Sequence, residues 1–145
     1  MSFIAEWFFM GAAGGDPFKV NFENVQYAIK KPNEYCIINT LPVEEQNCLI
    51  KTTLTARQEE TAINDMITKV DAPDKIVIVY GRNSCDNQVE QKYKQLRNLG
   101  IPQVYIYPGG LFEWALLQDI YGKDEFPTTE KALDPLKYKG DKIII

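Results

Sequence analysis

The sequence of 145 residues contains no histidine. Histidine is the commonest general base in enzymes, the usual partner of a nucleophilic serine or cysteine, and a frequent ligand of zinc. Its absence therefore excludes Ser/His and Cys/His catalysis and argues against most zinc sites. We expect a protein that carries neither a metal ion nor a cofactor.

Cysteine is scarce, since the chain has only Cys36, Cys48 and Cys85, which lie far apart in the sequence. An odd number of widely spaced cysteines indicates neither a disulfide framework nor a cysteine-based metal site. We therefore expect a reducing compartment and an intracellular, cytoplasmic protein. Cys36 and Cys48 lie in or beside apolar strands, where a buried structural cysteine is the usual case.

Positive charge is also in short supply, with 16 Lys and Arg against 20 Asp and Glu, a net charge of -4 and a pI near 4.9. Proteins that bind nucleic acids need a cluster of basic residues to contact the phosphates, and the sequence has none. A protein or a small molecule is the expected partner.

Long apolar runs are missing. Residues 3–10 are apolar except for Glu6, but this segment is too short to cross a bilayer and follows no basic stretch. We predict no transmembrane segment, and we expect residues 3–10 to pack on the domain or on a partner. The terminal residues Ile143, Ile144 and Ile145 predict an edge strand or a packed terminus. Either apolar end offers a surface for oligomer formation.

The chain does contain alternating strand and helix patterns. Apolar runs predict strands over residues 35–39, 75–80 and 103–107, a shorter strand over 48–50, and a short strand or an extended entry to the domain over 18–20. A helix pattern follows or precedes each of the longer runs. Such alternation is typical of an α/β fold with a central, mostly parallel sheet and helices on both faces.

Capping residues predict where the helices begin. Asn21 precedes the first helix, Thr55 with Gln58 forms a capping box for the second, and Asn87 with Glu90 forms one for the third. A fourth helix over residues 111–121 is apolar on nearly every side. At this length we predict one domain over residues 18–129, with an aromatic extension over 1–17 and a tail over 130–145.

The apolar strand that ends at Tyr80 runs directly into a polar loop. In parallel sheets, ligands are held at the carboxyl ends of the strands, and a following helix N-terminus offers free amides to an anion. We therefore predict an anion-binding or ligand-binding loop at this place. It consists of Gly81, Arg82, Asn83, Ser84, Cys85, Asp86 and Asn87.

The region from Phe18 to Thr129 resembles a rhodanese domain, the fold of thiosulfate and other sulfurtransferases. The likeness rests on the strand and loop at Tyr80, on a Leu-x-x-Leu-Gly helix end at Gly100, and on one further motif. That motif is the most specific of the three and reads Val104-Tyr105-Ile106-Tyr107-Pro108-Gly109-Gly110-Leu111-Phe112-Glu113-Trp114.

The resemblance implies an active-site cysteine directly after the strand, but Gly81 stands at that position. The chain also departs from the family at Ser84 and Asp86, where a glycine and an arginine are usual, and at Asn39-Thr40-Leu41, where the family has Asp-x-Arg. We therefore predict a catalytically silent rhodanese-like module that binds a protein partner or a small anion.

The alternative is an atypical sulfurtransferase that carries a persulfide on Cys85. This cysteine lies near a helix start, where amides and the helix dipole lower the pKa of a thiol, and Arg82 is placed to support the anion. A phosphatase is excluded, because the family's phosphatases need an arginine six residues after the cysteine. The three cysteines have Pro42, Leu54 and Gln91 there.

Overall fold

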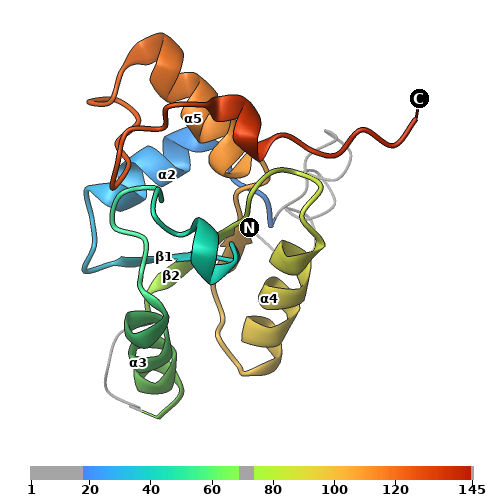
Figure 1. Cartoon of the computed structure of the whole chain (residues 1–145). Coiled ribbons are helices and arrows are strands. Elements are labelled where there is room, and N and C mark those ends of the chain that lie inside the picture. Colours follow the sequence, from blue (N-terminus) through green and yellow to red (C-terminus); the bar gives the residue numbers. More distant parts are fainter. Residues whose placement is uncertain (1–17, 69–73, 145) are drawn as a thin grey trace, which may run out of the picture.

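The computed structural model describes residues 18–68 and 74–144 (Figure 1). Along the chain, the described part forms α2 Phe22–Ile29, β1 Tyr35–Asn39, the 3-10 helix η1 Val43–Glu45, α3 Ala56–Thr68, β2 Ile76–Tyr80, α4 Asn87–Asn98, β3 Val104–Ile106, α5 Gly110–Tyr121 and the 3-10 helix η2 Pro135–Tyr138.

The three described strands form one parallel sheet in the order β1-β2-β3. Single parallel bridges extend it on either side, from Lys19 to Ile106 and from Thr53 to Ile37. Parallel strands need a long crossover between them, and the helices supply it. This arrangement confirms the predicted α/β fold with a central, mostly parallel sheet.

Helices cover both faces of the sheet, with α2 and α5 on one side and α3 and α4 on the other (Figure 1). Successive residues of a strand point to opposite faces, so each strand contributes to two apolar cores. The strand residues that point toward α2 and α5 are Ile37, Ile78 and Tyr80, and they pack with Leu111 and Trp114. Toward α3 and α4 point Cys36, Ile38, Val77, Val79, Val104 and Ile106.

Two of the three predicted helix caps are confirmed, and the third is wrong. The Asn21 side chain accepts from the amides of residues 23 and 24, and Thr55 and Gln58 form the reciprocal pair of a capping box. Helix α4, however, is capped by Asp86, whose carboxylate accepts from the amide two residues later at 2.9 Å. Asn87 is the first residue of α4 and not its cap, because the Asp86 carboxylate already accepts from the Gln88 amide.

Two other predictions need correction. Residues 48–50 form no strand, since Ile50 makes a single antiparallel bridge to Thr128. Ile143 and Ile144 form neither an edge strand nor a packed terminus, because each is 86% exposed. The predictions for residues 1–17 and for Ile145 fall outside the described residues.

The segment after α5 contributes to the core. Phe126, Ala132 and Tyr138 are buried in the cluster that contains Trp114, and the indole of Trp114 donates to the Pro127 carbonyl at 3.1 Å. Helix η2 packs against α5, and from there the chain passes toward the loop between β2 and α4 (Figure 1).

Candidate functional site

The predicted loop lies at the carboxyl end of β2, the central described strand, and leads into α4. The start of α5 holds it in place, since the amides of Leu111 and Phe112 donate to the carbonyls of Gly81 and Arg82, each at 2.9 Å. Gly110 has a φ of 65°, and a Cβ there would lie 2.7 Å from the Gly81 carbonyl oxygen. The Gly-Gly motif therefore allows this close approach.

The Asp86 carboxylate lies inside the concavity of the loop. It accepts from the Arg82 amide at 3.2 Å, from the Thr40 hydroxyl at 3.1 Å and from the Gln88 amide at 2.9 Å. Backbone amides at a helix N-terminus are suited to an anion. In this chain they hold the anionic side chain of the loop itself.

Gly81 is buried and lies against the same carboxylate. A Cβ at this position would be 2.3 Å from Oδ2 of Asp86, 2.5 Å from Cγ2 of Val89 and 2.8 Å from Oγ1 of Thr40. Real side chains do not approach so closely, so this arrangement leaves no room for a side chain at residue 81.

Cys85 lies on the outer rim of the loop and is exposed. Its amide donates to the Asn83 side chain at 2.9 Å, and its sulfur faces the tail, 3.5 Å from where a Cβ on Gly140 would be. Cys36 and Cys48 are buried, as expected. Burial raises the pKa of the Cys36 thiol, and the Cys48 thiol donates to the Glu130 carbonyl at 3.2 Å.

Side chains of the loop also bind the tail. The Arg82 guanidinium forms an ion pair with Glu45 at 3.2 Å and donates to the Lys137 carbonyl, while the Asn83 amide donates to the Tyr138 carbonyl at 2.8 Å. The tail thereby forms one wall of a cavity of about 390 Å³ beside Cys85. Its lining combines acidic side chains with Arg82 and Lys139.

The structure thus brings together residues that the sequence alone did not connect. Thr40 follows β1, and because parallel strands end at the same sheet edge, its position was open to prediction. No sequence pattern predicted that Glu45 or the tail would lie beside the loop. The remaining predicted site residues, Ser84 and Asn87, are exposed. The three hydrogen bonds to the Asp86 carboxylate come from Thr40, Arg82 and Gln88 and not from these two residues.

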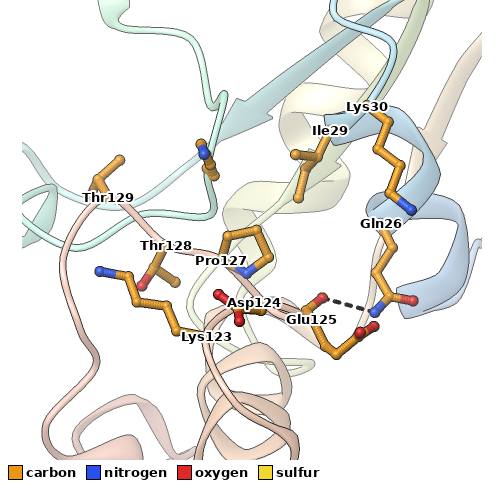
Figure 2. A pocket seen from close by; sticks show the side chains of 10 residues that line it. Gln26, Ile29, Lys30, Lys123, Asp124, Glu125, Pro127, Thr128 and Thr129 are labelled. Carbon is orange, nitrogen blue, oxygen red and sulfur yellow. Dashed lines mark hydrogen bonds between the residues drawn. The ribbon is translucent and has the colours of Figure 1, made fainter.

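A second cavity, of about 830 Å³, lies between α2 and the segment after α5, away from the loop (Figure 2). Its lining includes Lys30, Lys123, Asp124 and Glu125, and Gln26 donates to the Glu125 carbonyl at 2.8 Å. Figure 2 shows Lys30 and Lys123 on opposite sides of the cavity, so their charges do not converge on one point.

Neither a metal cluster nor a membrane span is found in the described part of the chain. Across residues 18–68 and 74–144, no three Cys, Asp or Glu side chains gather as potential metal ligands. Within the same ranges, no helix combines the length and the apolar character that crossing a bilayer requires.

A parallel sheet whose central strand delivers a short loop to a helix N-terminus defines an α/β domain of the class in which bound ligands lie at the carboxyl edge of the sheet. The family model of the rhodanese-like domain matches residues 30–117, more than half of the chain. The chain therefore belongs to the rhodanese-like family, as the motifs around Tyr80 and Trp114 predicted.

Solved structures share this fold. The BH2092 protein from Bacillus halodurans is 20% identical, with a TM-score of 0.57 and 82% of each chain covered. A thiosulfate sulfurtransferase from Pseudomonas aeruginosa is 20% identical, with a TM-score of 0.55, over 79% of this chain and 20% of that one. A protein from Lactobacillus plantarum is 16% identical, with a TM-score of 0.52, over 79% and 92% of the two chains. A search of curated proteins gives no match.

Proposed function

We propose that this rhodanese-like domain is a catalytically silent binding module whose loop engages a protein partner. The observation that carries the proposal is the position of the Asp86 carboxylate. It fills the space that a side chain at residue 81 would need, and it bonds to the amides of Arg82 and Gln88. The family's cysteine is expected at residue 81, so the nucleophile is missing and the amides that would bind its anion are occupied by Asp86.

A protein partner is favoured over a small anion for two reasons. An incoming anion would meet the like charge of Asp86 and would have to displace it from the amides. Arg82 and Asn83 instead donate to main-chain carbonyls of residues 137 and 138. Such carbonyls are what any polypeptide offers, so these donors suit a protein ligand whose main chain takes the place of the tail.

Sulfur transfer from thiosulfate to a thiol acceptor tests whether the module is silent. We expect the natural chain to transfer sulfur no faster than its Cys85→Ala variant, while an active thiosulfate sulfurtransferase in the same assay gives a clear rate. A rate for the natural chain several-fold above that of the variant would overturn the proposal.

Anion titration tests the choice between the two kinds of partner. The amide resonances of Arg82 and Gln88 are followed by NMR while sulfate or thiosulfate is added. We expect saturable shifts in an Asp86→Ala variant, in which the amides are released, and none in the natural chain. Saturable shifts in the natural chain would favour the small anion instead.

A second candidate function is sulfur transfer through Cys85, which its exposure beside the cavity with Arg82 favours. In this reaction the Cys85 thiolate attacks the outer sulfur of thiosulfate, sulfite leaves, and the persulfide then passes its outer sulfur to a thiol. Mass spectrometry after exposure to thiosulfate would detect one added sulfur atom on Cys85. The absence of this adduct would exclude the candidate.

A further inference from the structure

Helix α5 carries an apolar stripe that the described residues leave partly uncovered. Its inner side is buried through Leu111 and Trp114, but Phe112 and Leu116 on the outer side are only partly buried, and Ile120 is 69% exposed. These three residues are spaced by four, so they lie along one face. A helix that is apolar on all sides is normally covered on all sides.

A groove of about 600 Å³ runs along the N-terminal part of this stripe, beside Phe112 and Leu116. Phe112 and Leu116 line it from α5, Phe22 lines it from the start of α2, and Val20 lines it from the segment before α2. Pro108 and Tyr107 extend the apolar lining toward the loop, which the groove meets at Ser84, and the polar residues of the lining are Ser84, Asn21 and Glu113. Exposed apolar surface in a groove is a feature of interaction sites.

Residues 3–10 match the groove in chemistry, because seven of the eight are apolar and Trp7, Phe8 and Phe9 are consecutive aromatic residues. Aromatic side chains that fill apolar pockets are the usual anchors of an interface. These residues lie outside the described part of the chain, which begins at Phe18.

We propose that residues 3–10 dock in this groove of their own chain. Residues 11–17 join them to Phe18, and seven residues reach at most about 25 Å. Val20, only two residues beyond Phe18, already lines the groove. A short tether keeps the segment at a local concentration on the order of millimolar, far above that of a second copy in dilute solution. The inference goes beyond the proposed function, since it requires neither Asp86 nor Cys85.

Tryptophan fluorescence of the full chain tests the proposal. Trp7 and Trp114 are the two tryptophans, and Trp114 is fully buried, so the difference between the natural chain and a Trp7→Phe variant isolates the Trp7 signal. We expect acrylamide to quench Trp7 several-fold less than free N-acetyltryptophanamide. The protection should not change when the protein is diluted.

A Leu116→Lys variant places a charge in the groove, and it should restore full quenching of Trp7. Ile120→Lys is the matched control, because it puts the same charge one turn further along α5, outside the groove lining, and it should leave Trp7 protected. Phe112→Ala serves as a second groove variant if Leu116→Lys fails to fold, as judged by circular dichroism.

Three outcomes would overturn the proposal. Trp7 quenched like the free compound in the natural chain would show that the segment does not dock. Protection that survives both groove variants would place the segment elsewhere. Protection that is lost on dilution, together with a dimer at high concentration, would assign the groove to the segment of a second copy.

Discussion

Replacing Gly81 with alanine is the sharpest test of how the loop is built. The glycines of the described residues with a positive φ are Gly100, Gly110 and Gly122, so Gly81 has a backbone conformation that alanine adopts without strain. On backbone grounds alone, Gly81→Ala should stabilise the protein by about 0.4–1 kcal/mol, because it lowers the entropy of the unfolded chain.

The surroundings of the new methyl group predict the opposite sign. A Cβ would lie 2.3 Å from Oδ2 of Asp86 and 2.5 Å from Cγ2 of Val89, so one or both must move. Overpacking costs about 1–3 kcal/mol. If the carboxylate moves away, the loss of its cap on α4 adds about 1 kcal/mol. We therefore expect Gly81→Ala to lower the free energy of unfolding by about 1–3.5 kcal/mol after the entropic gain is subtracted.

Urea denaturation followed by circular dichroism measures this change. Gly140→Ala is the matched control, because a Cβ there meets the Cys85 sulfur at an ordinary 3.5 Å and should change stability little. In an Asp86→Ala background, Gly81→Ala should cost less than in the natural chain, since the nearest clash is gone. A stabilising Gly81→Ala, or an unchanged cost in that background, would refute the packing that we describe.

Three further predictions concern single groups. Asp86→Ala should lower the free energy of unfolding by about 1–2 kcal/mol and Asp86→Asn by less, because asparagine also caps the Gln88 amide; denaturation of both variants compares them. Cys85 should react with an alkylating agent at once and the two buried cysteines only after denaturation, as peptide mass mapping would show. Burial raises the pKa of Tyr80, and that of Tyr138 to about 12, from an ordinary value near 10. The unfolded chain therefore loses these protons first, and stability should fall as the pH rises from about 10 toward 12, which denaturation at each pH would measure.

The sheet and its helices were predictable because their signals are local. Apolar runs such as the one that ends at Tyr80 are strands buried on both faces, and the Asn21 and Thr55 caps bind amides two or three residues away. Parallel pairing then followed from strand and helix alternation. Thus the place of the loop, at the carboxyl edge of the sheet, was predictable from residues close together in the sequence.

The predictions that failed depend on contacts between distant residues or on a choice between neighbours. Asp86 and Asn87 are both residue types that cap helices well. Asp86 is favoured because its carboxylate also accepts hydrogen bonds from Thr40 and Arg82. The burial of Tyr138, a residue of the predicted tail for which no place in the core was predicted, depends on contacts with residues far away in the chain. No sequence pattern within the loop or within the tail predicts such contacts.

The two departures at Gly81 and Asp86 are separate features of the sequence, but they share one volume in the structure. A side chain at residue 81 and the Asp86 carboxylate cannot both occupy it, because their atoms would lie 2.3 Å apart. The carboxylate also places a negative charge beside the surrounding amides, at the position where a thiolate or an anionic substrate would otherwise bind. The amides of Arg82 and Gln88 therefore have an acceptor within the loop itself. A cysteine placed at residue 81 alone should be crowded against Asp86, so a sulfur-carrying site at residue 81 would require changes at both positions.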